Sequence, residues 1–487
     1  MEPTMLMNDD RWKGCCFTGQ WQPAARTAAV VEKATGEVMS QIGVATVEDL
    51  SAAARAASAA QPAWAAMPPD ERAAIFRRAA QSVDKNRDEL AAWIVRESGG
   101  LRSKADSELN STLGILHGAA AMMGEPQGLV LPSRVDQMSF ARRVPHGVVG
   151  VIAPFNFPLT LAIRAVAPAL VTGNAVVLKP DVQTAVCGGV LIARIFEEAG
   201  LPAGVLHVLP GGADVGEAIC KDPHIAMVAF TGSTAAGRKV GALCGAHLKK
   251  VSLELGGKNS LIVLDDADLD AAASGAAFGA WLHQGQICMA TGRILASEKI
   301  AAELTQRLTE KALRLPVGDP FKAKVALGPV INERQFKNID AVVKDSVAAG
   351  ATLHAGGTYE RLFYRPTVLS GVRPGMRVFE EEVFGPVASI TSFTSDDEAV
   401  ELANGTDYGL AAAVMSRSTG RALALGKRLR VGLLHINEQT VIGGLNVPFG
   451  GRGASGNGSR IGGPANWDEF TQWQWITVRD APPPYPF

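Results

Sequence analysis

Two residues in the middle of the chain have the types and the neighbours that covalent chemistry needs. Cys288 lies in the run Gly-Gln-Ile-Cys-Met (285–289), and Glu254 opens the run Glu-Leu-Gly-Gly-Lys (254–258). A cysteine thiolate is a strong nucleophile, and a nearby carboxylate can manage the proton transfers that accompany its attack. Taken singly, a cysteine is more often a small buried apolar residue and a glutamate at a strand end is more often a surface group. Together they predict a nucleophile, Cys288, and its base, Glu254.

Asn156 is a third candidate, because it lies between two prolines in the run Pro-Phe-Asn-Phe-Pro (154–158). The prolines predict an extended segment directly after an apolar strand, and an amide held there could donate to a developing oxyanion. An asparagine at this place could equally cap the helix that follows. The residues alone leave both interpretations open.

Composition narrows the functional classes. The chain has 487 residues, a formal charge of -1 and six cysteines without framework spacing. A nearly neutral chain without blocks of like charge predicts neither nucleic-acid nor membrane-surface binding, and free thiols favour a cytoplasmic protein. The N-terminus has no signal-peptide pattern, and prolines, asparagines and Arg164 interrupt the apolar region 144–178. No His/Cys cluster has metal-ligand spacing, so we expect no catalytic metal.

Hydrophobic periodicity predicts two α/β units. A helical region covers 46–90, with Thr46 as an N-cap and a second helix opening at 68–71. Strands separated mostly by helix-length gaps predict a parallel, doubly wound sheet. These strands are expected at 148–153, 175–178, 205–209, 225–230, 251–253 and 260–264.

A second alternation of helices and strands follows Asp268, and two further strands lie outside both units. Its helices are expected at 268–283, 300–315 and 335–349, and its strands at 388–393 and 433–436. The segments 130–144 and 473–478 also have strand character, and exposed strand edges commonly pair with another subunit.

The sequence predicts a nucleotide-binding site, although it lacks the G-x-G-x-x-G motif of the standard Rossmann fold at the expected place. The run 211–216 lacks the spacing of G-x-G-x-x-G. Thr231, Gly232 and Ser233 instead follow a strand and open a helix, whose N-terminus could receive a phosphate. Lys179 ends another strand, at the edge where parallel sheets bind ligands.

Seven runs in this order and spacing resemble the aldehyde dehydrogenase superfamily over nearly the whole chain. They are 154–158, 179–180, 230–233, 254–258, 285–288, 382–386 and 448–451. Within the superfamily, the runs 206–216, 283–289 and 485–487 look most like bacterial benzaldehyde dehydrogenases, which oxidise aromatic aldehydes.

The resemblance implies an α/β aldehyde dehydrogenase-like fold with two parallel-sheet domains. A Rossmann-like NAD(P)-binding domain would comprise 1–125, 146–254 and 455–469, and a catalytic domain 255–454. The segments 126–145 and 470–487 would form a small β oligomerisation extension in a homodimer or homotetramer.

The resemblance also implies a mechanism. Cys288 would attack the aldehyde to give a thiohemiacetal, whose oxyanion the Asn156 amide and the Cys288 backbone N–H would hold. Hydride transfer to nicotinamide would leave a thioester, and Glu254 would activate the water that hydrolyses it. A covalent intermediate divides one difficult step into two easier ones.

Further residues match the positions of the family that bind the cofactor. Lys179 and Glu382 would hold the two riboses, and Ser233, with Thr231 and Gly232, would lie near the pyrophosphate. Phe384 would pack beside the nicotinamide, and Ile152 and Phe155 complete the set. NAD-preferring members often carry a glutamate where this chain has Val182, so NAD is our first choice and NADP stays open.

The positions that would line the substrate tunnel are all apolar. They are Phe157, Leu161, Leu282, Ile287 and Phe449. This set favours an uncharged aromatic aldehyde, although the direction of the Arg164 side chain cannot be read from sequence. Vanillin, salicylaldehyde or a semialdehyde acid are the alternative substrates. A CoA-acylating relative would lack the hydrolytic glutamate, and a non-catalytic binding protein would not need the Cys288, Glu254 and Asn156 set.

Overall fold

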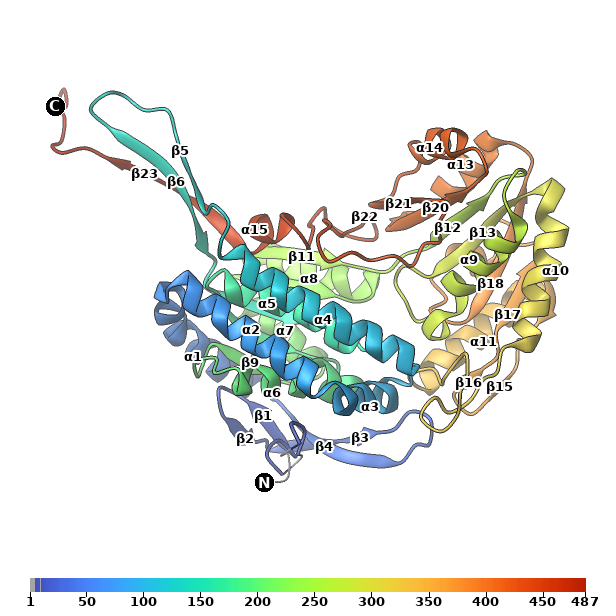
Figure 1. The fold of residues 1–487 in the computed structure, drawn as a ribbon, viewed down its shortest axis with the longest axis horizontal. Helices are drawn as coiled ribbons and strands as arrows, with labels where there is room; N and C mark the ends of the chain where they lie inside the picture. The colour runs from blue at the N-terminus through green and yellow to red at the C-terminus, as the bar shows by residue number, and fades with distance from the viewer. Residues whose placement is uncertain (1–4, 9) are drawn as a thin grey trace.

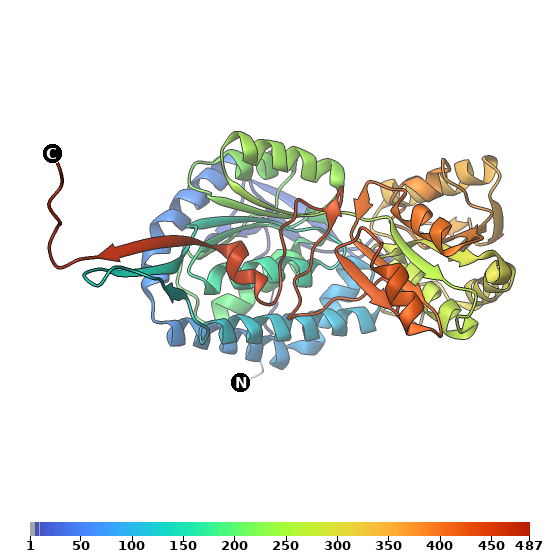
Figure 2. The same cartoon turned by 90° about the horizontal axis from the view of Figure 1, so that it is seen from above.

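The molecule consists of two α/β lobes and a projecting β arm (Figures 1 and 2). The computed structural model describes residues 5–8 and 10–487. In Figure 1 the N-terminal lobe runs from blue to green and the C-terminal lobe from lime to orange. No helix within this described part is long and apolar enough to cross a membrane.

The N-terminal lobe is built on a mostly parallel sheet. Its order is β11 (Lys250–Glu254), β10 (Met227–Thr231), β7 (Val148–Ile152), β8 (Ala175–Lys179), β9 (Leu206–Val208), β1 (Cys15–Phe17) and β2 (Trp21–Pro23). The first five strands are those predicted and pair in parallel. The antiparallel edge strands β1 and β2 were not predicted. Grouping the strand 260–264 with this sheet was wrong, because it is β12 of the other lobe.

The central strands of this sheet are apolar on both faces, and helices cover both faces. Along β7, Val149 and Val151 join the core beneath α5, while Val148 and Ile152 join the opposite core beneath α1 and α7. The helices of this lobe are α1 (Val47–Ala66), α2 (Pro69–Lys85), α3 (Arg87–Ser98), α4 (Arg102–Met122), α5 (Pro158–Val171), α6 (Leu191–Glu198), α7 (Ala213–Lys221) and α8 (Thr234–Ala246). Thr46 caps α1 in a reciprocal capping box with Asp49, as predicted.

The C-terminal lobe has a second, mostly parallel sheet. Its order is β14 (Thr352–Ala355), β17 (Thr367–Ser370), β18 (Val387–Phe393), β13 (Thr291–Ser297), β12 (Asn259–Val263), β20 (Ala411–Met415) and β21 (Leu433–Ile436). Its helices are α9 (Leu269–Trp281), α10 (Glu298–Arg314), α11 (Glu333–Ala348), α12 (Arg377–Glu380), α13 (Asp396–Asn404) and α14 (Thr419–Gly426). The predicted helices and strands of this lobe are confirmed.

The arm is an antiparallel sheet that extends away from the N-terminal lobe (Figures 1 and 2). It comprises β5 (Gly128–Val130), β6 (Met138–Pro145) and β23 (Thr471–Val478), and β6 pairs with β23 along its whole length. This confirms strands outside both cores. Short elements complete the fold: the ribbons β3 (Arg26–Val31) with β4 (Val38–Val44), β15 (Tyr359–Glu360) with β16 (Phe363–Tyr364) and β19 (Tyr408–Gly409) with β22 (Arg452–Gly453), and α15 (Ala465–Phe470).

Candidate active site

Four candidate residues end four adjacent strands of the N-terminal sheet. Ile152, Lys179, Thr231 and Glu254 are the last residues of β7, β8, β10 and β11. The parallel register pairs Ile152 with Lys179, and Thr231 with Glu254. All four therefore lie along one carboxyl edge, where open parallel sheets bind ligands.

Glu254 is a buried carboxylic acid at this edge. Its side chain is 5% exposed, and neither carboxylate oxygen has a hydrogen-bond partner among the described residues. Burial raises the pKa of Glu254 to about 8, although the positive charges of Arg164 and Arg460 oppose the shift. Burial has this effect because it penalises the ionised form. The carboxyl group is therefore mostly protonated at neutral pH and becomes a base as the pH passes 8.

Cys288 follows a tight turn that its neighbours fix from several sides. His283 and Gln284 have positive φ angles of 48° and 55° at the start of this turn. Gly285 has φ +67°, and a Cβ there would lie 2.1 Å from the carbonyl oxygen of Gly385. Only glycine fits so close an approach of two backbones. Residues 283–285 therefore form a strained turn, and the loop that follows it places Cys288 in the wall of the cavity.

Three polar contacts hold this loop in place. The side chain of Gln284 donates to the Gly99 carbonyl (3.0 Å), and that of Gln286 accepts from the Ile331 amide (2.9 Å). The side-chain amide of Asn259 donates to the backbone carbonyl of Cys288 (2.8 Å). The loop is thus bonded to segments of both lobes, which keeps the thiol in a defined position.

Asn156 lies beside the Cys288 loop. It is 4% exposed, and its Nδ2 donates to the carbonyl of Gln286 at 2.9 Å. Asn156 and Cys288 line the same cavity, and an amide nitrogen carries a second hydrogen for another acceptor. The alternative that Asn156 caps α5 is wrong, because the side chain of Glu108 accepts from the Leu159 and Thr160 amides at that helix end.

The thiol of Cys288 is protonated at neutral pH in this environment. Burial, reinforced by the carboxylates of Glu382 and Glu254, raises the pKa of Cys288 to about 12, and Arg164 opposes the shift. Nucleophilic attack requires the thiolate, so a positive charge or a proton acceptor has to act on the thiol before it reacts.

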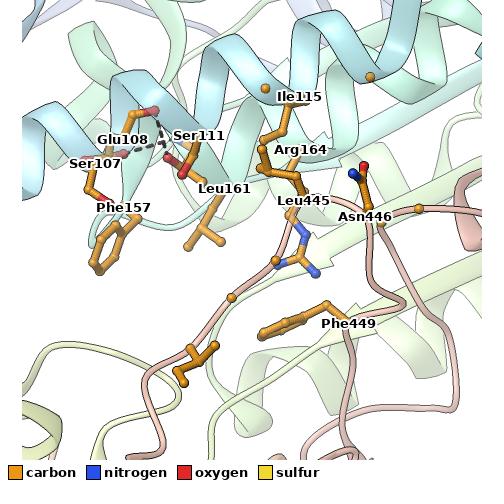
Figure 3. Close-up of a pocket in the computed structure, with 18 of the residues that line it drawn as sticks. Ser107, Glu108, Ser111, Ile115, Phe157, Leu161, Arg164, Leu445, Asn446 and Phe449 are labelled. Atoms are coloured by element: carbon orange, nitrogen blue, oxygen red, sulfur yellow. Dashed lines mark hydrogen bonds between the residues drawn. The ribbon is translucent and has the colours of Figure 1, made fainter. Parts of the chain in front are cut away.

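A cavity of about 560 Å³ leads to this thiol (Figure 3). It is lined by Cys288 and Asn156, and by all five predicted substrate positions: Phe157, Leu161, Leu282, Ile287 and Phe449. A second, smaller cavity is lined by Glu254, Thr231 and Cys288 together with Leu161, Arg164 and Phe449. Cys288 is therefore shared by both spaces, and Glu254 approaches it from the smaller one.

Arg164 places a cation in the wall of an otherwise largely apolar cavity. Its guanidinium carbon lies 4.0 Å from the centre of the Phe449 ring, and Nη2 donates to the Ile461 carbonyl (3.2 Å). Figure 3 shows the guanidinium above the ring. Burial lowers the pKa of Arg164, while Glu254 and Cys288 oppose the shift. The sequence placed Arg164 near Asn156 without showing which way its side chain points.

The other candidate cofactor residues gather near the same edge. Ser233 caps α8, accepting from the Ala236 amide at 3.3 Å, so the helix N-terminus follows Thr231 directly. Glu382 accepts from the Gly257 amide (3.3 Å), and a Cβ on Gly256 would lie 2.1 Å from its carboxylate. The glycines after β11 therefore let Glu382 of the C-terminal lobe approach the N-terminal sheet.

The donors and acceptors at this edge match the chemistry of a dinucleotide. Burial lowers the pKa of Lys179, with Asp181 and Asp214 opposing the shift. Lys179 and Glu382 can bond to ribose hydroxyls, and the α8 N-terminus can receive a phosphate. Phe384 lies edge-on to Phe155, with ring centres 5.8 Å apart. No group of three metal-ligating side chains occurs within residues 5–8 and 10–487.

Two residues that sequence reasoning missed lie where α4 meets the start of α5, and one of them, Glu108, lines the cavity. Lys104 and Glu108 form a buried ion pair one turn apart on α4, and the ammonium lies 4.8 Å from the centre of the Phe157 ring. The second oxygen of Glu108 caps α5, which carries Leu161 and Arg164. A lysine and a glutamate four residues apart are common on solvated helix faces, so their spacing gave no sign of burial.

Comparisons with known proteins agree with this geometry. The Aldehyde dehydrogenase family matches residues 21–476. A vanillin dehydrogenase from Amycolatopsis sp. is 54% identical over 99% of this chain and 100% of its own, and the benzaldehyde dehydrogenase [NAD(+)] from Pseudomonas putida is 52% identical over 98% of each. A salicylaldehyde dehydrogenase from Pseudomonas putida G7, solved with salicylaldehyde, superposes with a TM-score of 0.93 at 35% identity, covering 97% of this chain and 99% of that one. The chain belongs to the aldehyde dehydrogenase family.

Proposed function

We propose that the protein oxidises aromatic aldehydes, benzaldehyde-like in their core, to carboxylic acids with NAD+. The observation that carries this proposal is the largely apolar cavity of about 560 Å³ that ends at Cys288, with Asn156 and Glu254 beside the thiol. Such a cavity suits an aromatic ring, and the thiol suits a carbonyl carbon. The vanillin and benzaldehyde dehydrogenases among the relatives act on aldehydes of this kind.

Each residue has one task in the proposed reaction. The Sγ of Cys288 forms a bond to the aldehyde carbon, and the Asn156 amide with the Cys288 backbone N–H holds the oxyanion. NAD+, held by Lys179, Ser233 and Glu382, would supply the acceptor for the hydride that leaves the thiohemiacetal carbon. Water deprotonated by Glu254 then attacks the thioester, the C–S bond breaks, and the acid leaves. Preorganised donors at a developing charge are the strongest contribution that such a site makes.

Lys179 is proposed to bind the adenine-side ribose of the cofactor, and Glu382 the nicotinamide-side ribose. Lys179→Met is expected to raise the KM for NAD+ about 10- to 100-fold, because it removes hydrogen bonds from a charged donor. The KM for the aldehyde should change little. Initial rates at varied NAD+ concentrations measure the effect, and an unchanged KM for NAD+ would remove Lys179 from the binding site.

NAD+ is preferred over NADP+ in this proposal, although the usual acid is absent. Val182 is 37% exposed, and Asp181 accepts from the Gln183 amide (2.9 Å) at the start of a short 3-10 turn. Asp181 is two residues after Lys179, and a carboxylate beside the adenine-side ribose would repel a 2′-phosphate. Steady-state rates with both cofactors measure the preference.

The turnover number is expected to rise with pH until about pH 8. Burial raises the pKa of Glu254 to about 8, so its ionised fraction grows roughly tenfold per pH unit below that value. Only the ionised carboxylate can take a proton from the attacking water. A profile of kcat from pH 6 to 9.5 tests this, and a flat profile below pH 8 would show that Glu254 is already ionised or does not limit turnover.

The substrate class is tested by NADH formation with benzaldehyde, vanillin, salicylaldehyde and succinate semialdehyde. We expect kcat/KM to be at least tenfold higher for the aromatic aldehydes than for succinate semialdehyde, because Arg164 is the cation of the cavity wall and already stacks on Phe449. A preference for the semialdehyde would instead assign Arg164 to the substrate carboxylate, and the function to a semialdehyde dehydrogenase.

The arm is proposed to join subunits in a homodimer or homotetramer of this cytoplasmic enzyme. The outer strands β5 and β23 expose apolar side chains, among them Val130 (92% exposed) and Trp475 (71% exposed). An exposed β edge with apolar side chains favours pairing with another chain. Light scattering of the chain truncated after Phe470 should give a smaller assembly than the full chain. Equal masses would place the interface elsewhere.

A further inference from the structure

Arg164 is the one cation among the described residues that line the two cavities at Cys288. It lies on α5, stacks on the ring of Phe449 (Figure 3) and donates through Nη2 to the Ile461 carbonyl (3.2 Å). This bond uses one of the five N–H donors of a guanidinium. Within the described part of the chain, no carboxylate lies within 4.0 Å of Arg164 to form an ion pair. A partly enclosed charge without such a partner is costly, so the arrangement favours an anion beside Arg164.

The smaller cavity brings this cation together with two acids. Arg164, Cys288 and Glu254 all line a space of about 20 Å³, which has room for about one water molecule. Apart from these three and Thr231, the described residues around the space are apolar. Little solvent therefore screens the charges from one another, and they interact more strongly than charges on the protein surface.

The charged groups that face the thiol and those that face the carboxyl group overlap at one cation. Around the thiol of Cys288 they are Glu382, Glu254 and Arg164. Around the carboxyl group of Glu254 they are Arg164, Arg460 and Glu469. Arg460 is not among the described residues that line either cavity, whereas Arg164 lines both. Arg164 is therefore the cation that the two acids share.

The two acids need a positive charge at different stages of the proposed reaction. The thiol has to be ionised when it attacks, and the carboxyl group has to be ionised when it takes a proton from water. Two anions side by side repel, so one cation does not readily support both at once. In the thiohemiacetal and in the thioester the sulfur is bonded to carbon and carries no charge. The charge of Arg164 then acts on Glu254 alone.

We propose that Arg164 is a positioning residue whose charge first stabilises the thiolate of Cys288 and then, once the sulfur is bonded to carbon, the carboxylate of Glu254. The two acids thus ionise in succession beside one cation. The proposal rests on the proposed function, because this order requires Cys288 to react with the aldehyde before Glu254 activates water.

The test measures the rate at which iodoacetamide alkylates Cys288 in the full-length protein between about pH 6 and 9.5, which requires neither aldehyde nor turnover. The reaction forms an S–C bond and releases iodide, and its rate follows the thiolate fraction. Arg164→Met should lower the rate at least tenfold across this range, because a rise of one unit in the pKa of the thiol lowers the thiolate fraction tenfold. Mass spectrometry of the peptide that carries Cys288 separates it from the other thiols.

Three further variants separate the charge of Arg164 from its packing. Arg164→Gln, which can still donate to the Ile461 carbonyl, should behave like Arg164→Met. Arg164→Lys, which keeps the charge, should restore most of the rate. Arg314→Met, the matched control at the exposed end of α10, should alkylate as the wild type does. An unchanged rate in Arg164→Met, or a loss that Arg164→Lys does not restore, would overturn the proposal.

The same profile reports the carboxyl group, because its ionisation alters the reactivity of the neighbouring thiol. The wild type should show a change of slope near pH 8, to which burial raises the pKa of Glu254, and Glu254→Gln should lack it. Arg164→Met should move this change of slope upward by about one pH unit. If it stays in place, Arg164 does not support Glu254 and the proposal fails.

Turnover gives the last comparison, with benzaldehyde and NAD+ in a stopped-flow instrument. Arg164→Met should slow both the burst of NADH and the steady state, each by about tenfold, because each phase depends on one of the two acids. A loss confined to one phase would overturn the proposal. A wild type that oxidises no aromatic aldehyde would instead overturn the proposed function, and the alkylation rates would still decide whether Arg164 supports the two acids.

Discussion

Replacement of Cys288 by alanine is expected to abolish aldehyde oxidation, with kcat falling more than about a thousandfold. The alanine leaves no atom that can bond to the aldehyde carbon, so neither the thiohemiacetal nor the thioester can form. The loop itself should persist, because its hydrogen bonds involve Gln284, Gln286 and the Cys288 carbonyl rather than the thiol. NADH formation with benzaldehyde measures turnover, and calorimetric titration with NAD+ shows that the cofactor site is intact.

Cys15 provides the matched control. It is a free, partly exposed thiol on β1, which is next to the edge strand β2 and, in the N-terminal sheet, four strands away from β10 and five away from β11. Cys15→Ala should retain wild-type turnover. Substantial turnover in Cys288→Ala would contradict covalent catalysis, whereas loss in both variants would point to a general sensitivity of the fold to cysteine replacement.

Glu254→Gln is expected to separate the two halves of the reaction. The first turnover should still give a burst of NADH close to one equivalent per active site, because thiohemiacetal formation and hydride transfer use Cys288 and Asn156. The steady-state rate should then fall about 100- to 10,000-fold, because the thioester has lost the base that activates water. Stopped-flow absorbance of NADH resolves both phases.

The size of the burst decides when Glu254 acts. If the variant shows no burst, the carboxylate also takes the proton of the Cys288 thiol, whose pKa burial raises to about 12. Glu381→Gln serves as the control: this neighbour of Glu382 in sequence pairs with Arg377 at the surface and should leave both phases unchanged.

The sequence predicted the elements whose signals are local. The capping box of Thr46 and the apolar runs of β7 and β8 depend on neighbours in the chain, and their bounds agree with the structure to within a residue or two. The membership of β12 in a sheet depends on distant partners. The short link between β11 and β12 has no room for a crossover helix, which was a sign that β12 leaves the first sheet.

The same limit holds for the site: residues placed by local signals could be predicted, and residues placed by distant contacts could not. Strand ends in a parallel sheet share one edge, so Lys179, Thr231 and Glu254 could be grouped before any coordinates. The direction of Arg164 and the burial of Lys104 and Glu108 are set by contacts between helices far apart in sequence. Periodicity shows which face of a helix is apolar, but it does not show which polar side chain is enclosed when two helices pack.

The ion pair of Lys104 and Glu108 makes α4 and α5 a single mechanical unit. Glu108 is bonded to Lys104 on its own helix and to the first amides of α5, and the cost of exposing a buried charge opposes any separation of the two. The cavity residues that α4 and α5 carry therefore keep their relative positions. A rigid corner of this kind keeps a bound aldehyde aligned with Cys288.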